Sequence, residues 1–364
     1  MNIGFIGLGL IGGSIAKALK ENTNDIHITV YDINQDSLIQ AKEDGVADIT
    51  TTTIGEEFTS CDVIFLCAPV QKNAENLKVL KEYLSPTCIL TDVGSVKTDI
   101  ARHIEAEGLS KQFIGGHPMA GSERYGYINS KASLLENAYY ILTPNQDTPP
   151  ENLSLLKELV GKTGALPLII DSKMHDYVTA GISHLPHVIA ASLVNLVKSH
   201  DNEDEIMKTV AAGGFKDITR IASSNATMWQ EICLTNAGNI SALLSDYITS
   251  LCEIKASIDA GDAGDIYDFF DEARIYRDSF ISASSGPIKI CYDFTVDISD
   301  ETGALASIAT ILALKQISIK NIGIVHNREV QTGALRIEFY DEESLNAAKE
   351  ILTLRGYTIY AKKL

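Results

Sequence analysis

The segment Gly7-Leu-Gly9-Leu-Ile-Gly12 is the feature that most restricts how this 364-residue chain can fold. It lies between a short apolar run, residues 3–6, and an amphipathic stretch, residues 15–20, and so predicts a strand, a tight turn and a helix. Gly7 permits the turn, Gly9 lets a phosphate group approach the backbone, and Gly12 allows the helix to pack closely on the strand. The helix N-terminus then offers amide donors and the positive end of its dipole. We therefore expect a dinucleotide site at the start of an α/β sheet.

A carboxylate at Asp32 strengthens this prediction. The second apolar run ends in Val30-Tyr31-Asp32, and Asp32 falls 20 residues after Gly12, a spacing typical of a carboxylate that accepts hydrogen bonds from the adenosine ribose. No Arg follows in residues 33–36, so a 2′-phosphate would be repelled and would find no partner. The sequence thus predicts NAD rather than NADP. The alternative is a glycine turn that binds nothing or binds another nucleotide.

The rest of the first half repeats the pattern of apolar runs and amphipathic stretches. The expected strands and helices are strands 3–6, 26–31, 63–68, 88–92, 139–142 and 166–170, with helices 15–20, 37–44, 74–83 and 153–160 between them. Such alternation predicts a doubly wound parallel sheet with crossover helices. We expect this NAD-binding, Rossmann-like domain to span residues 1–172.

From residue 173 to residue 285 the strand signal disappears and helical periodicity takes its place. The expected helices are residues 177–197, 203–210, 218–221 and 236–260, all with wide apolar faces. Wide faces predict either the core of an all-helical domain or a dimer interface that a second subunit covers. We expect residues 173–285 to form a helical substrate and dimerisation domain, followed by a linker at Ser284-Ser285-Gly286-Pro287.

The last part of the chain, residues 287–364, changes pattern again. The expected elements are strands 288–298, 318–326, 332–340 and 358–362 and helices 304–315 and 343–354. Their order is strand, helix, strand, strand, helix, strand. This is the ferredoxin-like α+β order.

Composition narrows the range of partners and compartments. The chain has 30 Lys and Arg against 48 Asp and Glu, a formal charge of −18, which argues against nucleic acid and anionic membranes as partners. An anionic substrate therefore needs a local basic cluster. The 6 cysteines lack metal-ligand spacing, which indicates reduced thiols and no metal site. With no signal-like N-terminus and no uninterrupted apolar run near about 18 residues, we expect a cytoplasmic protein.

Several polar or glycine-rich segments are richer in chemistry than packing requires. They are residues 92–97, 115–123, 175–187 and 213–220, together with Trp229. The first two are expected to follow strand ends, on the side of an open parallel sheet where ligands bind. Each has a structural reading as well: His175 pairs with Asp176, and Trp229 is part of the core.

Taken together, these segments resemble the prephenate dehydrogenases of tyrosine biosynthesis. The resemblance runs through both the nucleotide half and the helical half, and it depends on residues 115–123, 175–187 and 213–220 with Trp229. Residues 288–364 resemble a regulatory ACT domain, which makes Gly303 and Asn321 candidate regulatory residues. Thr302 stands where many ACT domains have Pro.

The resemblance implies an NAD-dependent oxidative decarboxylation of prephenate to 4-hydroxyphenylpyruvate. Such a reaction needs an acceptor for the hydroxyl proton of the ring. His117 is the candidate, because a neutral imidazole takes a proton near cytosolic pH. Ser95 is expected to share the hydroxyl by hydrogen bonding.

The same resemblance assigns the two substrate carboxylates to cationic residues. Arg220 has the planar fork that matches a carboxylate with two hydrogen bonds, so we expect it at the ring carboxylate. Lys216 and His187 are expected at the pyruvyl side chain. Glu123, with Asp217, is expected to orient these cations.

Two other functions remain open at this point. An arogenate dehydrogenase would act on the same ring with an amino group in the side chain; Lys216 and His187 favour prephenate over it. A non-catalytic sensor of NAD and an amino acid is a different class of protein, against which His117 and Arg220 argue. We also expect a homodimer and, as a regulatory ligand, tyrosine.

Overall fold

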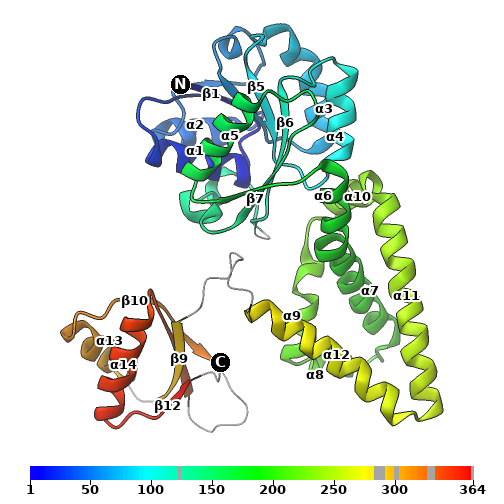
Figure 1. The fold of residues 1–364 in the computed structure, drawn as a ribbon, viewed down its shortest axis with the longest axis vertical. Coiled ribbons are helices and arrows are strands. Elements are labelled where there is room, and N and C mark those ends of the chain that lie inside the picture. Colours follow the sequence, from blue (N-terminus) through cyan, green and yellow to red (C-terminus); the bar gives the residue numbers. More distant parts are fainter. Residues whose placement is uncertain (122–123, 283–291, 299–302, 326–332, 362–364) are drawn as a thin grey trace. The chain divides into compact units, whose positions relative to one another are not determined.

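The computed structural model describes residues 1–121, 124–282, 292–298, 303–325 and 333–361 (Figure 1). The chain divides into two compact units, Met1–Ile266 and Tyr267–Leu364, each described here by itself. The domain boundary expected at residue 172 falls inside the first unit and stays a prediction. The linker expected at residues 284–287 lies outside the described residues.

The first unit begins with an eight-stranded sheet in the order β3-β2-β1-β4-β5-β6-β7-β8. Its strands are β1 (Asn2–Ile6), β2 (His27–Tyr31), β3 (Ile49–Thr51), β4 (Val63–Leu66), β5 (Ile89–Asp92), β6 (Phe113–Pro118), β7 (Tyr139–Thr143) and β8 (Leu166–Ile169). Strands β1 to β6 are all parallel, which confirms the doubly wound fold. The expectation of a wholly parallel sheet is wrong at one edge, because β7 is antiparallel to β6 and β8 follows the direction of β7.

Helices cover both faces of this sheet (Figure 1). They are α1 (Leu10–Asn22), α2 (Gln35–Glu43) and α5 (Pro150–Lys162) on one face, and α3 (Val70–Leu80) and α4 (Thr98–Ala106) on the other. Successive side chains of a strand point to opposite faces. In β1, Ile3 and Phe5 accordingly belong to the first apolar core and Ile6 to the second. The sequence predicted four of these helices but neither α4 nor the short strand β3.

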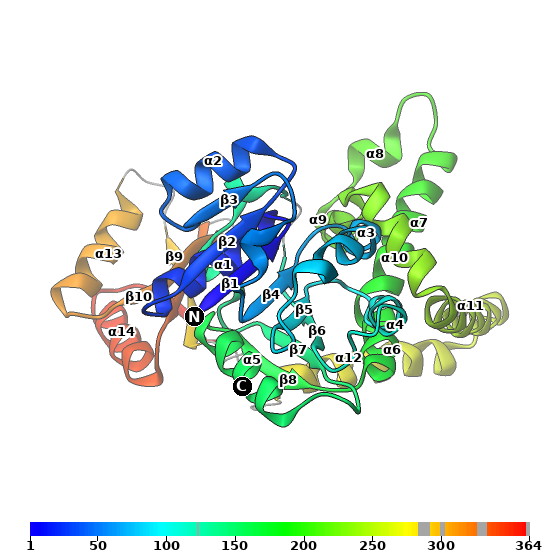
Figure 2. The same ribbon diagram turned by 90° about the horizontal axis from the view of Figure 1, so that it is seen from above.

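The remainder of the first unit is helical (Figure 2). Its elements are α6 (Ser172–Thr179), a π-helical turn (Ala180–His184), α7 (Leu185–His200), α8 (Ile206–Val210), α9 (Gly213–Thr219), a 3₁₀ turn (Arg220–Ser223), α10 (Ala226–Thr235), α11 (Ala237–Ala260) and the start of α12 (Ala263–Ser282). The π turn leads directly into the first turn of α7, where Pro186 has no N–H to continue the regular hydrogen-bond pattern. Helices α10 and α12 were not predicted.

In the described part of the first unit, apolar side chains on these helices remain exposed. Ile182, Leu234 and Ile258 are 65%, 68% and 58% exposed. Of the two alternatives that the sequence left open, an internal core and an interface with a second subunit, the structure favours the interface. Large exposed apolar surfaces mark contact sites rather than free surface.

By length and composition alone, the stretch Ser172–His200 is long and apolar enough to cross a membrane. Its first turns nevertheless contain the fully buried His175 and Asp176. Both are hydrogen-bonded to residues of the sheet domain. Polar groups bonded in this way indicate a helix that packs in protein.

The second unit contains a four-stranded antiparallel sheet in the order β10-β11-β9-β12. Its elements are β9 (Tyr292–Ile298), α13 (Ala304–Leu314), β10 (Ile319–Val325), β11 (Gly333–Phe339), α14 (Glu342–Leu354) and β12 (Ile359–Ala361). Phe294, Val296 and Leu335 of the sheet pack with Ile308 and Leu352 of the helices in a separate apolar core. The predicted ferredoxin-like order is confirmed.

Candidate active site

The glycine loop after β1 has the geometry that a dinucleotide requires. Gly7 has φ +96°, and a Cβ there would lie 2.7 Å from the amide nitrogen of Ala68. A Cβ at Gly12 would lie 2.8 Å from the Gly7 carbonyl oxygen, so this glycine serves the packing of α1 on the strand. Beside Gly9, by contrast, the space is open, and no side chain caps the N-terminus of α1 there. The loop therefore leaves room and amide donors for a pyrophosphate.

Asp32 follows β2 and is fixed beside this loop. Its Oδ2 accepts a hydrogen bond from the Leu8 amide at 2.6 Å, and its Oδ1 accepts one from the Asn34 amide at 2.7 Å. Each carboxylate oxygen has a second lone pair for a ribose hydroxyl. These acceptor oxygens thus fit the ribose of NAD, and the backbone amides hold the carboxylate in place.

His117 lies within β6, whereas the sequence placed residues 115–123 after a strand. The two glycines misled that prediction. A Cβ at Gly115 would lie 2.3 Å from Thr143 Oγ1, and one at Gly116 would lie 2.5 Å from the Asp92 carbonyl oxygen. These positions need glycine because neighbouring chain passes close by, and not because the strand ends. His117 is thus at the carboxyl end of β6, on the sheet edge that carries the glycine loop.

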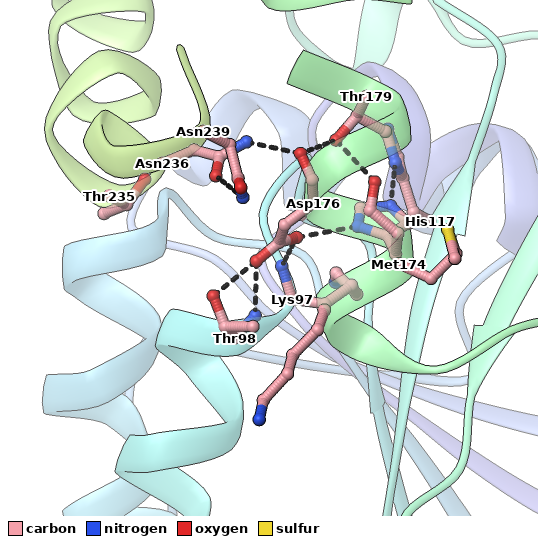
Figure 3. A network of polar contacts seen from close by, with 12 residues as sticks. Lys97, Thr98, His117, Met174, Asp176, Thr179, Thr235, Asn236 and Asn239 are labelled. Carbon is pink, nitrogen blue, oxygen red and sulfur yellow. Dashed lines mark hydrogen bonds and ion pairs between the residues drawn. The ribbon is translucent and has the colours of Figure 1, made fainter. Parts of the chain in front are cut away.

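The His117 ring is hydrogen-bonded to the buried His175 and, through it, linked to the carboxylate of Asp176 (Figure 3). His117 Nδ1 lies 2.8 Å from His175 Nε2, and His175 Nδ1 lies 2.8 Å from Asp176 Oδ1. Burial, with further contributions from His175, Lys97 and His184, lowers the pKa of His117 well below 6.5. The imidazole is therefore neutral at cytosolic pH and ready to accept a proton.

The Asp176 carboxylate joins α6 to the start of α4. It accepts hydrogen bonds from the Lys97 amide at 2.7 Å, from the Thr98 amide at 2.9 Å and from the Thr98 hydroxyl (Figure 3). Burial acts to raise the pKa of Asp176, but the hydrogen bonds from His175, Thr98 and Lys97 outweigh it and lower the pKa. The group is an anion held by donors, so it is a firm anchor for the helical part of the unit.

A buried ion pair lies on the sheet side of this anchor. Lys97 Nζ pairs with the Asp92 carboxylate and donates to the Gly116 carbonyl oxygen at 2.7 Å. Asp92 Oδ1 in turn accepts from the Gly116 amide at 3.1 Å. Burial lowers the pKa of Lys97, with Asp92 and Asp176 opposing. The pair clamps the end of β5 to β6 just before His117.

The helical side of the site is formed by His184, His187 and the indole of Trp229. The His187 ring stacks on Trp229 with 3.7 Å between ring centroids, and its Nδ1 donates to the Ser183 carbonyl oxygen at 2.9 Å. Burial lowers the pKa of His187, and Arg220 adds to the shift. The 3₁₀ turn that begins at Arg220 packs against α7, the helix that carries His187.

The remaining predicted residues have definite places. Ser95 is half-buried between β5 and α4, Lys216 is exposed on α9, and Arg220 is exposed in the 3₁₀ turn that follows α9. Glu123 lies outside the described residues. Gly303 has φ +92° and precedes α13 in the second unit, where Asn321 is exposed on β10. Among the described residues, no group of three or more His, Cys, Asp or Glu side chains could hold a metal ion.

Sequence reasoning gave no part in the chemistry to His175, Asp176 and Lys97, although all three lay inside segments that it singled out; the pairing of His175 with Asp176 that it offered as a structural reading is confirmed. Their signal was available: a His-Asp pair at the start of an apolar helix that folds into a protein interior must find polar partners. The spacing along the chain could not name those partners, because Lys97 and Asp176 are 79 residues apart.

The chain is similar to known proteins over most of its length. Residues 15–168 match the family model for the nucleotide-binding domain of prephenate dehydrogenase, and residues 171–272 match the model for its dimerization domain. The prephenate dehydrogenase of Bacillus subtilis (strain 168) is 37% identical over 359 residues, 98% of this chain and 97% of its own length.

Two solved structures extend the comparison. Prephenate dehydrogenase from A. aeolicus in complex with hydroxyphenyl propionate and NAD+ is 34% identical, with a TM-score of 0.73 over 77% of this chain and 98% of that one. Synechocystis arogenate dehydrogenase is 31% identical, with a TM-score of 0.69 over 77% of this chain and 100% of that one. The two family models together match more than half of the chain, and this chain belongs to the prephenate dehydrogenase family.

Proposed function

We propose that this chain catalyses the NAD-dependent oxidative decarboxylation of prephenate to 4-hydroxyphenylpyruvate. The observation that carries the proposal is the neutral His117 at the same sheet edge as the glycine loop. A base at that edge lies on the side where a dinucleotide-binding sheet presents its nicotinamide to a substrate. The family relationship supports the same reaction.

The chemistry divides between the cofactor and this chain's own residues. NAD⁺, bound at the glycine loop, supplies the acceptor for the hydride of the ring C4. His117 Nε2 accepts the proton of the C4 hydroxyl while the bond to the ring carboxylate breaks and its electron pair completes the aromatic ring. That bond cleavage releases carbon dioxide. His117 then returns the proton to the phenol oxygen, which regenerates the neutral histidine. Ser95 hydrogen-bonds the same hydroxyl.

Cations on the helical side would orient the dianionic substrate. Arg220 meets the ring carboxylate with two parallel hydrogen bonds. Lys216 precedes Arg220 by four residues, and His187 lies close enough to Arg220 for its pKa to respond. These two are assigned to the pyruvyl side chain. Glu123 keeps the orienting role that the sequence predicts.

Arogenate is the second candidate substrate, since an arogenate dehydrogenase is among the similar solved structures. Lys216 and His187 favour prephenate, because a third cation suits its more negative charge. A non-catalytic sensor would not need a base such as His117, hydrogen-bonded to the buried pair of His175 and Asp176. An NADH absorbance assay with each substrate separates the three: turnover of prephenate is expected, and turnover of neither substrate would refute the enzyme assignment.

We infer a homodimer from the exposed apolar faces of α7, α10 and α11 and from the match to a dimerization domain. Sedimentation at graded protein concentrations tests this. A cytoplasmic location is proposed with it, supported by the free thiols of Cys61, Cys67, Cys88, Cys233 and Cys252. Nucleic acid and membrane are not proposed as partners, given the charge of −18.

The second unit is proposed as an ACT-like regulatory domain that binds tyrosine. Gly303 precedes α13 with φ +92°, a conformation that lets a ligand approach the backbone at a helix N-terminus. Asn321 is exposed on β10, where a register shift separates it from Ile319. Both are assigned to regulation.

A further inference from the structure

His175 and Asp176 contact no reacting atom in the mechanism above, yet both are fully buried directly behind His117. An ionised carboxylate only accepts hydrogen bonds. His175 Nδ1, 2.8 Å from Asp176 Oδ1, must therefore carry a proton, and in the neutral imidazole His175 Nε2 is left with a lone pair. That lone pair faces His117 Nδ1 at 2.8 Å, so His117 Nδ1 must be the donor.

We infer that His175 and Asp176 are positioning residues that hold His117 in the tautomer whose Nε2 is free to accept the substrate's hydroxyl proton. This inference rests on the proposed function. An isolated histidine exchanges between its two tautomers, and only one of them exposes a lone pair at Nε2. Bonding Nδ1–H to a fixed acceptor removes the unproductive tautomer and fixes the plane of the ring.

The other ionisable groups around His117 do not compete for this role. Lys97 Nζ, before α4, is held by Asp92 and by the Gly116 carbonyl oxygen. His184, in the π turn, accepts a hydrogen bond from Asn236 Nδ2 at its own Nδ1, with a separation of 3.1 Å. His175, on α6, is thus the neighbour that sets the proton on His117, and Asp176 sets the proton on His175.

The chain of hydrogen bonds also crosses between two parts of the unit. His117 belongs to β6, whereas His175 and Asp176 belong to α6. Asn236 Nδ2 at the start of α11 donates to the Asp176 carbonyl oxygen at 2.8 Å, and the start of α4 donates to its carboxylate. The base is therefore set in its productive form only when α6 is seated on the sheet.

Asp176→Asn tests the inference in the full-length protein. When the new amide keeps its oxygen at the Thr98 donors, its NH₂ takes the place of Oδ1; it then faces His175 Nδ1 and loses the hydrogen bond from the Lys97 amide. The proton on His175 then moves to Nε2, and His117 must carry its proton on Nε2. We expect kcat to fall about 100-fold or more, within the range of lost general-base catalysis, while KM for prephenate stays within about twofold. In ¹⁵N NMR spectra, the protonated nitrogen of His117 should change from Nδ1 to Nε2.

His175→Gln and His175→Phe provide the conservative and the disruptive variant. The Gln carbonyl oxygen still accepts from His117 Nδ1, so this variant should retain most of kcat; Phe offers no acceptor and should lose it. Thr98→Val is the matched control, because it removes the hydroxyl hydrogen bond to Asp176 and leaves the link to His175. Its kcat should be unchanged even where its melting temperature falls.

Three results would overturn the inference. One is a wild-type spectrum with the His117 proton on Nε2. Another is an Asp176→Asn protein with unchanged kcat, and the third is an equal loss of kcat in Thr98→Val, which would assign the effect to instability. The spectrum does not depend on turnover. A wild-type protein that oxidises neither prephenate nor arogenate would therefore refute the proposed function while still reporting the tautomer.

Discussion

The glycine loop and the chain of hydrogen bonds behind His117 lie on one edge of one sheet, but they are built in different ways. The loop comes from the backbone of consecutive residues, Gly7 to Gly12, and its requirement is space. The chain of hydrogen bonds comes from side chains 58 residues apart, and its requirement is the position of a proton. A local motif is enough to find the first kind of site. The second kind needs the fold.

The largest expected effect is a loss of kcat at the side-chain site, by which we mean His117 with His175 and Asp176. His117→Asn removes the group that accepts the hydroxyl proton, so kcat should fall by about 10²–10⁴-fold with little change in KM. Steady-state kinetics by NADH absorbance measure both. Because the pKa of His117 lies well below 6.5, the wild-type rate should stay level as the pH is lowered through 6.5 and fall only at more acidic pH. A near-normal kcat in the variant would mean that another group takes the proton.

Arg220→Gln is expected to have the next largest effect, on the KM for prephenate. Loss of a charged hydrogen-bonding partner typically costs about 1.5–3 kcal/mol, which corresponds to an increase of roughly 10- to 150-fold in KM for prephenate. Arg220→Lys should restore only part of the affinity, because a point charge does not reproduce the planar fork. An unchanged KM in the Gln variant would remove Arg220 from the substrate site.

Two glycines of the loop are expected to have different roles, one in cofactor binding and one in the stability of the fold. Gly9→Ala adds a Cβ into open space, so the melting temperature should not change while KM for NAD⁺ rises about tenfold or more. Gly7→Ala is the matched variant: its Cβ would meet the Ala68 backbone at 2.7 Å with φ +96°, so it should destabilise the fold. Thermal unfolding with and without NAD⁺ distinguishes the two. Equal melting temperatures for both variants would contradict the roles given to these glycines.

Particular residues show how far the sequence could predict this molecule. Short apolar runs located most strands of the first sheet, because a parallel strand that is buried on both faces is apolar throughout. It missed β6, where Gly115 and Gly116 suggest a turn but are required by the close approach of Thr143 and Asp92. The reversed direction of β7 was equally hidden, since an apolar run has no direction.

The candidate site divides in the same way. Asp32 followed from its spacing after the glycines, and His117 from its motif. The partners of His117 did not follow from either, because His175 and Asp176 acquire a role only when α6 meets β6 and α4. Tertiary contacts of this kind carry no periodic signal in the sequence.

Asp32→Ser should have a smaller effect, on cofactor choice. A serine hydroxyl still bonds to the ribose but no longer repels a 2′-phosphate, so the preference for NAD⁺ over NADP⁺ in kcat/KM should narrow by about tenfold. The carboxylate also accepts from the Leu8 and Asn34 amides, so the melting temperature should be measured alongside. Equal use of both cofactors by the wild-type protein would contradict the role of Asp32.

The smallest expected effect on catalysis comes from removing the part of the chain farthest in sequence from both sites. The ferredoxin-like region has its own sheet and its own apolar core. A chain that ends at residue 285 should therefore keep kcat and KM for prephenate within about twofold while losing inhibition by tyrosine. An effector alters activity only through different affinities for active and inactive states, and removing its binding domain removes that difference.

Gly303→Val in the full-length protein completes this test. Valine at φ +92° strains the turn before α13, so tyrosine inhibition should weaken while the catalytic constants stay those of the wild type. Inhibition curves for the full-length, truncated and Gly303→Val proteins compare the regulatory role with a purely architectural one, in which the domain only reinforces the oligomer. If the truncated enzyme kept full tyrosine sensitivity, the inhibitor would have to act at the catalytic site, where Arg220 and His187 would receive its carboxylate. Tyrosine would then be a second ligand of the side-chain site and would compete there with prephenate.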